Sequence, residues 1–133
     1  MTQRIAIINQ KGGVGKTTTT INVAAYLQKM GKSVLVVDLD PQGNATSGIG
    51  VVKENVVTST YDVIMGEASL SDAVVDVDRL GVHVLPANAS LAAAEADLVP
   101  QLQRESKLLA ALKDAVYDYV LIDCPPSLGL LTL

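Results

Sequence analysis

A glycine-rich segment near the N-terminus has the residue types that bind phosphate. It reads Asn9-Gln10-Lys11-Gly12-Gly13-Val14-Gly15-Lys16-Thr17-Thr18 and contains the Gly-Lys-Thr of a phosphate-binding loop. Glycines allow backbone N–H groups to curl around phosphate oxygens, and a helix that begins near Thr17 adds the positive end of its dipole. The Lys16 ammonium suits the β- and γ-phosphates, and the Thr17 hydroxyl suits Mg²⁺. The predicted phosphate-binding residues are Gly12, Gly13, Val14, Gly15, Lys16 and Thr17.

The start of this loop departs from the usual pattern. The glycine expected five residues before Gly15 is replaced by Gln10, and a second lysine, Lys11, stands beside it. The alternative interpretation is a glycine turn that only joins a strand to a helix. The run Gly-Lys-Thr-Thr between a predicted strand and a predicted helix favours phosphate binding over that alternative.

Aspartates that follow apolar runs are candidates for the rest of such a site. Asp40 ends one run, and Asp123 ends another after Val120-Leu121-Ile122. An aspartate after an apolar strand can order Mg²⁺, and a second carboxylate near the γ-phosphate can orient the attacking water. Asp38 could support either role. Strand-end acids also serve as ordinary caps and turns, but beside a phosphate loop we expect at least one to be functional.

The elements that must position these residues alternate between strands and helices. This alternation predicts a doubly wound α/β fold of the P-loop NTPase type, in which a mainly parallel sheet is flanked by helices and ligands bind at the carboxyl ends of the strands. Residues 41–58 show no sustained periodicity and are predicted to form an irregular connection. The strands are predicted at 4–8, 33–39, 82–85 and 119–122, and the helices at 17–30, 60–65, 70–75, 90–99 and 105–115.

Length and composition predict a single nucleotide-binding domain over residues 1–133. The chain is 49% hydrophobic with no Trp or Phe, so its core must be aliphatic. Its apolar runs are too short for a membrane span or a signal peptide, and a cytoplasmic protein is expected. The single cysteine, Cys124, excludes an internal disulfide framework and is interpreted as a small filler. His83 is interpreted as a packed or edge residue of its strand.

Charge is divided unevenly along the chain. The net charge is −4, from 10 basic and 14 acidic residues, yet residues 1–37 contain five basic residues and no acid. The overall acidity argues against a nucleic-acid footprint spread over the whole chain. An anion-binding site is therefore expected at the N-terminal end, although solvated helix faces are an alternative explanation.

Three segments together resemble the ParA/Soj family of partition ATPases. They are KGGVGKTTT at 11–19, DLDPQGNAT at 38–46 and LIDCPPS at 121–127, in the order found in that family. The resemblance covers essentially the whole chain. It implies ATP and Mg²⁺ as ligands, and hydrolysis of ATP to ADP and phosphate in the intact protein.

The resemblance also implies a role for each candidate residue. Lys16 and Thr17 bind ATP and Mg²⁺, and Thr18 contacts phosphate. Asp40 positions the hydrolytic water. Asp123 is the acidic residue of the second nucleotide motif and a predicted metal ligand.

Lys11 corresponds to the signature lysine of the family. By the resemblance it reaches across an ATP-dependent homodimer to the partner's phosphates, where it can neutralise transition-state charge only after dimerisation. The resemblance further implies a ParB-type centromere-binding partner that stimulates hydrolysis, and association with the nucleoid when ATP is bound. Family members continue well beyond Leu133, so the sequence is interpreted as a C-terminally truncated, N-terminal part. Nonspecific DNA binding is assigned to the missing C-terminal portion, and no membrane partner is expected.

Three alternatives stay open at this stage. A MinD-like, membrane-associated cell-division ATPase shares the loop but relies on a C-terminal amphipathic helix, and no such helix is visible before Leu133. A nitrogenase-reductase-like electron carrier needs two cysteines per subunit, and only Cys124 is present. The third alternative is an inactive fragment that neither folds nor hydrolyses ATP.

Overall fold

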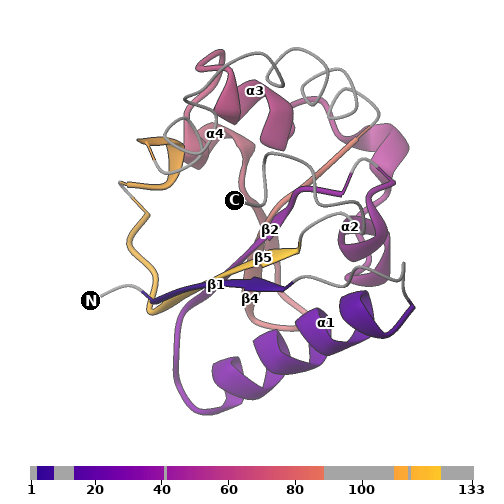
Figure 1. Ribbon diagram of the computed structural model, residues 1–133, viewed down its shortest axis with the longest axis vertical. Helices are drawn as coiled ribbons and strands as arrows, with labels where there is room; N and C mark the ends of the chain where they lie inside the picture. Colours follow the sequence, from indigo (N-terminus) through magenta and orange to yellow (C-terminus); the bar gives the residue numbers. More distant parts are fainter. Residues whose placement is uncertain (1–2, 8–13, 41, 89–109, 114, 124–133) are drawn as a thin grey trace.

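A five-stranded sheet forms the centre of the molecule (Figure 1). The computed structural model describes residues 3–7, 14–40, 42–88, 110–113 and 115–123. The strand order is β1-β5-β2-β4-β3, and every neighbouring pair is parallel except β3 with β4. This confirms the predicted mainly parallel sheet. The strands are β1 (Gln3–Ile7), β2 (Val34–Asp38), β3 (Val75–Val77), β4 (Val82–Leu85) and β5 (Tyr119–Asp123).

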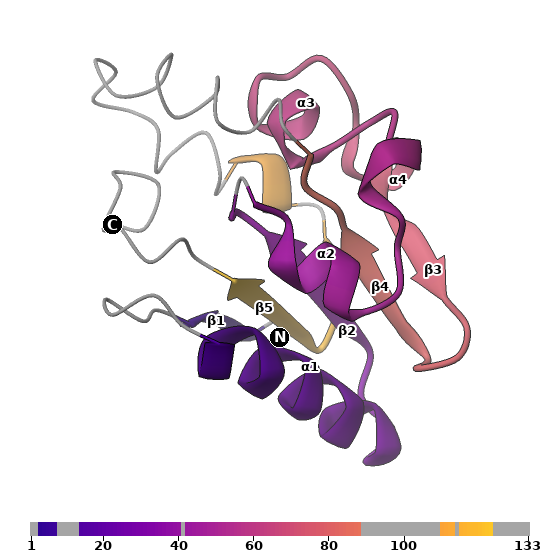
Figure 2. The ribbon, with the colours of Figure 1, turned by 90° about the vertical axis from the view of Figure 1, so that its right-hand side faces the viewer.

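Helices cover both faces of this sheet (Figure 2). Helix α1 lies on one face, whereas α3 and α4 lie on the other, so the predicted doubly wound arrangement is confirmed. None of the helices in the described part of the chain is long and apolar enough to cross a membrane. The helices are α1 (Val14–Lys29), α2 (Asn44–Gly48), the 3₁₀-helix η1 (Lys53–Asn55), α3 (Thr60–Ile64) and α4 (Leu70–Ala73).

The central strand β2 shows why this sequence forms a buried parallel strand. All five of its residues are buried. Successive side chains of a strand point to opposite faces, so Val34 and Val36 pack on the α1 side while Leu35 and Val37 pack on the α3 and α4 side. A strand covered on both faces has no polar side, which explains its uninterrupted apolar run.

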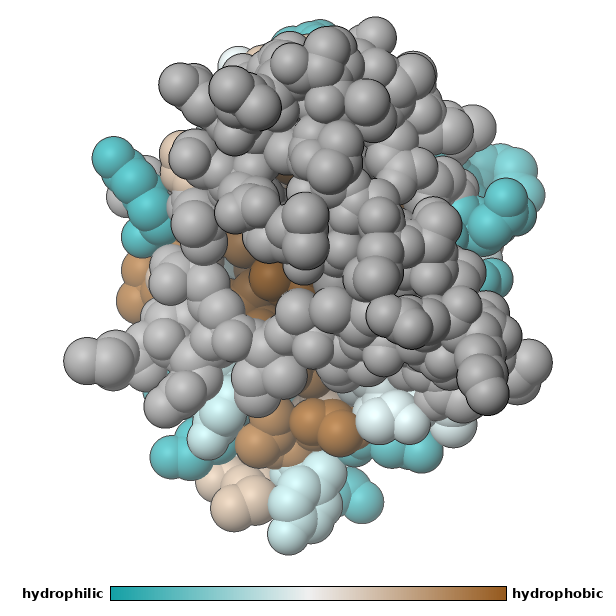
Figure 3. All heavy atoms as spheres, viewed as in Figure 1, coloured by the Kyte–Doolittle hydropathy of each residue, from teal (hydrophilic) through white to brown (hydrophobic). Residues whose placement is uncertain are grey.

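Helix α1 begins earlier than predicted and ends within one residue of its predicted end. It begins at Val14, three residues before the expected Thr17. At its end, the Gly31 N–H donates to the Gln28 carbonyl at 2.9 Å and the Lys32 N–H donates to the Leu27 carbonyl at 3.1 Å. This pair of bonds is the Schellman motif, so Gly31 provides the predicted stop. On the face shown in Figure 3, hydrophobic side chains over α1 are bordered by hydrophilic ones.

Two further predictions of secondary structure were wrong. The connection over 41–58 contains α2 and η1, which have five and three residues and are too short to show helical periodicity. The helix predicted over 70–75 ends at Ala73, because Val74 is extended and Val75 begins the antiparallel strand β3. The predicted helix over 90–99 lies outside the described residues, and of the helix over 105–115 the structure describes a helical segment at 110–112.

Candidate functional site

The carboxyl edge of the sheet brings two predicted site residues into one row. Asp123 of β5 is in register with Asp38 of β2 on one side and with Ile7 of β1 on the other. Both aspartates are fully buried. The ladder continues one step further, since the Leu39 N–H donates to the Asp123 carbonyl at 2.9 Å. Two neighbouring carboxylates are therefore held next to the point where β1 leads into the glycine-rich loop.

Asp38 lies at the centre of a buried hydrogen-bond network. Its Oδ2 accepts from the backbone N–H of Thr46 at 2.8 Å and from the Thr46 hydroxyl at 2.6 Å, and its Oδ1 accepts from the backbone N–H of Asp40 at 3.0 Å. The Thr46 Oγ1 in turn accepts from the backbone N–H of Ala87 at 2.9 Å. The network thus joins the end of β2 to α2 and to the segment that follows β4.

Burial raises the pKa of Asp38 from 3.8 to about 6, because the ionised carboxylate loses its hydration. The negative charge of Asp123 also contributes to this raised pKa, while the hydrogen bonds from Thr46 and from the Asp40 backbone oppose it. Desolvation is the largest of these effects. Ionising a carboxyl group at this edge therefore costs free energy, and a cation bound there would reduce that cost.

Asp40 lies just beyond β2 and is 2% exposed. Its two carboxylate oxygens are held separately: Oδ1 accepts from the backbone N–H of Gln42 and Oδ2 accepts from the Asn44 side-chain amide, both at 3.0 Å. The Asp40 carboxylate is thus oriented by its own loop and by the first residue of α2.

The glycine-rich loop is described only from Val14 onward. Val14, Gly15, Lys16 and Thr17 form the first turn of α1, and Thr18 is exposed on the same helix. The backbone N–H groups of a first helical turn have no partners within the helix and suit an anion. The predicted residues Lys11, Gly12 and Gly13 lie outside the described residues, as does Cys124.

Several residues of this network were not predicted from the sequence. Asn44 contacts the Asp40 carboxylate and Thr46 contacts the Asp38 carboxylate. The Ala87 N–H is joined to Asp38 through the Thr46 hydroxyl. The signal available for Asn44 and Thr46 was their place in the segment after Asp40, which is rich in short polar side chains that bond to nearby backbone and carboxylate groups. For Ala87 no signal exists, because it contributes only its backbone N–H.

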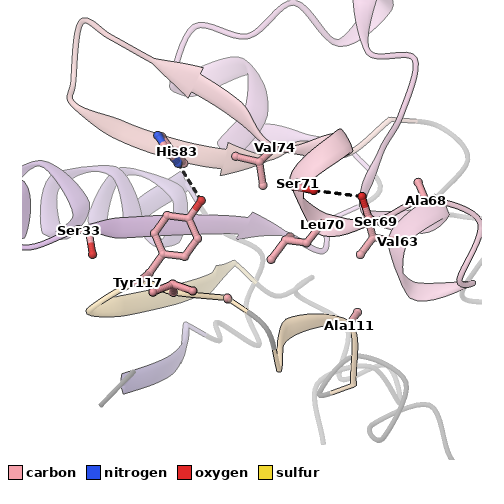
Figure 4. Close-up of a pocket in the computed structure, with 12 residues that line it drawn as sticks. Ser33, Val63, Ala68, Ser69, Leu70, Ser71, Val74, His83, Ala111 and Tyr117 are labelled. Carbon is pink, nitrogen blue, oxygen red and sulfur yellow. Dashed lines mark hydrogen bonds between the residues drawn. The ribbon is translucent and has the colours of Figure 1, made fainter.

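A second candidate region lies at the opposite, amino-terminal edge of the sheet (Figure 4). It is a cavity of about 630 Å³ whose lining includes Leu70, Val74, Ser33 and a pair formed by His83 and Tyr117. The His83 Nδ1 and the Tyr117 hydroxyl are 2.7 Å apart, and the His83 Nε2 is 3.7 Å from an Asp76 carboxylate oxygen. Burial and the Asp76 charge raise the pKa of Tyr117. Among the residues that the structure describes, no predicted site residue lines this cavity.

The residues of the carboxyl edge fit a Mg²⁺-bound nucleotide. Mg²⁺ binds oxygen ligands and usually takes one or two protein carboxylates or hydroxyls together with phosphate oxygens and water. Asp123 and Asp38 supply carboxylates at this edge, and the first turn of α1 supplies N–H groups for phosphate. The cavity at the amino-terminal edge has no comparable set of oxygen ligands among its described lining residues.

Comparison with known proteins shows which family the chain belongs to. A family model described as an AAA domain, AAA_31, matches residues 2–133. The chain is 52% identical to the sporulation initiation inhibitor protein Soj of Bacillus subtilis over 97% of its length, and 55% identical to the chromosome-partitioning ATPase Soj of Thermus thermophilus over 98%. It belongs to the ParA/Soj family of AAA-domain P-loop ATPases. The family membership that the three segments predicted is therefore confirmed.

The fold of this ParA/Soj chain is also similar to that of a solved structure. The chain is similar to cobyrinic acid a,c-diamide synthase from Mycobacterium smegmatis, crystallised with an ATP analogue and magnesium, with a TM-score of 0.93 and 46% identity over 99% of the chain. The chain spans about half the length of the relatives it matches: 52% of the Bacillus protein, 49% of the Thermus protein and 55% of this structure.

Proposed function

We propose that the carboxyl edge of the sheet binds ATP with Mg²⁺ and, in the intact protein, hydrolyses ATP to ADP and phosphate to drive partitioning of DNA. The observation that carries this proposal is the row formed by Ile7, Asp123 and Asp38, which sets two buried carboxylates where β1 leads into the loop and α1. Membership in a family of partition ATPases supports the partitioning role.

The proposal assigns binding roles to the loop and the first turn of α1. Gly12, Gly13, Val14 and Gly15 present backbone N–H groups to the phosphates, and Lys16 adds a positive charge. Thr18 contacts phosphate from the following turn. Thr17 and Asp123 would hold Mg²⁺, which, when bound, neutralises charge on the phosphates.

Asp40 orients the attacking water in this proposal. Its two oxygens are fixed by Gln42 and Asn44, so the carboxylate is aimed before any ligand binds. Lys11 is proposed to supply a further cation from a second subunit, which would make hydrolysis depend on dimerisation. The regulated form is an ATP-dependent homodimer that binds DNA nonspecifically and is stimulated by a ParB-type partner.

Calorimetric titration with Mg²⁺-ATP tests the binding step. We expect Lys16→Ala to weaken binding at least about tenfold, because the phosphates lose a charged hydrogen bond. Lys113→Ala is the matched control, since Lys113 is an exposed lysine that the proposal does not use, and it should bind as the unsubstituted protein does. Binding of ATP that is unchanged in Lys16→Ala would overturn the proposed site.

Steady-state hydrolysis tests the chemical step. Asp40→Asn keeps the shape of the side chain but loses the carboxylate, and we expect kcat to fall about 10²-fold or more while ATP binding is retained. A variant that hydrolyses ATP at the original rate would exclude Asp40 from the water-positioning role. Sedimentation with and without ATP, and salt-dependent binding to unrelated DNA, test the dimer and the DNA partner.

A further inference from the structure

A lysine outside the family motifs holds the loop that follows Asp40. The Lys53 ammonium, from η1, donates to the backbone carbonyl of Gln42 at 2.5 Å. The N–H of the same residue, Gln42, donates to the Asp40 carboxylate at 3.0 Å. Lys53 and Asp40 thus bind the two polar backbone groups of one residue.

The stem of Lys53 also packs directly over the next residue, Gly43. This glycine has a φ of +67°, which is in the left-handed region, and a Cβ placed on it would lie 2.4 Å from the Lys53 Cδ. Any larger residue would push the lysine away from the loop. The Gly43 N–H donates to the Asp40 carbonyl at 2.8 Å, so the turn is closed tightly beneath the lysine stem.

The short helix that carries Lys53 is itself anchored. The Asn55 N–H donates to the Val52 carbonyl and the Val56 N–H donates to the Lys53 carbonyl, both at 3.0 Å. The Asn88 side chain, which follows β4, donates to the Val56 carbonyl at 3.2 Å. Lys53 therefore reaches the Asp40 loop from a short helix that is bonded, through Val56, to the segment after β4.

From this geometry we propose that Lys53 is a positioning residue for Asp40. It holds the Gln42 peptide in the orientation in which its N–H fixes one oxygen of the Asp40 carboxylate. This inference rests on the proposed function, because it assigns Lys53 to the hydrolysis that Asp40 is proposed to support. In this role Lys53 acts on Asp40 through the Gln42 peptide.

Amide hydrogen exchange, followed by NMR, tests the clamp without any need for ATP. In Lys53→Met the stem remains and the donor is lost, so we expect the Gln42 N–H to exchange about tenfold faster or more, the size expected for a charged hydrogen bond. Lys53→Arg keeps a donor and should restore most of the protection. Arg79→Met is the matched control, because the Arg79 guanidinium donates to the Ile49 carbonyl at 3.1 Å, beyond the other end of α2. Unchanged exchange in Lys53→Met would overturn the clamp.

ATP turnover tests the positioning role. We expect Lys53→Met to lower kcat about three- to tenfold with KM and ATP affinity unchanged, since only the orientation of Asp40 is disturbed. Lys53→Arg should recover the rate, and Arg79→Met should not lose it. Faster exchange together with an unchanged kcat would overturn the positioning role. An unsubstituted protein that binds ATP without hydrolysing it would overturn the proposed hydrolysis and this role together, while exchange would still decide the clamp.

Discussion

Asp38 and Asp118 make nearly the same hydrogen bonds at opposite edges of the sheet, yet their pKa values move in opposite directions. Asp38 Oδ2 accepts from the N–H and hydroxyl of Thr46 at 2.8 and 2.6 Å. Asp118 Oδ2 accepts from the N–H and hydroxyl of Ser33 at 2.8 and 3.3 Å. The pKa of Asp38 is raised to about 6, whereas the pKa of Asp118 is lowered.

Burial decides between the two outcomes. Asp118 is exposed, so its carboxylate keeps its hydration and the bond from the Ser33 N–H lowers its pKa. Asp38 is fully buried, and the loss of hydration outweighs three hydrogen bonds. The carboxyl edge is thus a place where charge is held at a cost, as expected of a site that binds cations, while the amino-terminal edge uses the same bonds only to join β2 to β5.

The largest expected effect is a loss of stability as pH rises through the range set by Asp38. The folded pKa of about 6 lies above the ordinary 3.8, so between these values the folded state binds more protons and the free energy of unfolding falls with rising pH. About 2 pKa units correspond to about 3 kcal/mol by pH 7. We expect Asp38→Asn to remove this slope when urea unfolding is compared between pH 4 and pH 7. Parallel pH profiles of the two proteins would contradict the comparison.

Thr46→Val is expected to have the next largest effect. The substitution keeps the shape of the side chain but removes the hydroxyl that donates to Asp38 and accepts from the Ala87 N–H. Two buried groups lose a partner, and we expect the free energy of unfolding at pH 7 to fall by about 2 kcal/mol. Thr58→Val, at a half-buried threonine before α3, is the matched control and should change the free energy of unfolding by much less. Equal losses in both variants would show that the network around Asp38 is not special.

Ser33→Ala is expected to have the smallest effect. It removes the hydroxyl near Asp118 but keeps the backbone N–H, which is the main cause of the lowered pKa. We expect the Asp118 pKa, measured by NMR, to rise partway toward its ordinary value and not beyond it. A value above the ordinary range would show that burial, and not hydrogen bonding, governs this edge as well. The contribution of Asp118 to stability is present above its ordinary pKa and is lost as pH falls.

The sequence predicted those parts of the fold that depend on apolar patterns. The run Val34–Val37 predicted a strand buried on both faces. Asp38, Asp40 and Asp123 were expected at the carboxyl edge of the sheet, because each follows an apolar run. The strand β3 escaped prediction because it has only three residues, two half-buried and one exposed, which is too short a run to show a strand pattern. The roles of Lys53 and Ala87 escaped for a different reason. Both roles depend on hydrogen bonds of backbone groups, which every residue type carries, so the residue types do not reveal them.

The antiparallel strand β3 affects how readily the sheet can associate with other chains. As the last strand of the described sheet, it leaves one row of backbone N–H and C=O groups without a neighbouring strand. An open edge of this kind can recruit a strand from another copy and start aggregation. The strand has only three residues and carries the exposed Asp76 at its centre. A short, charged border of this kind discourages such pairing and keeps the apolar strands behind it from acting as a template.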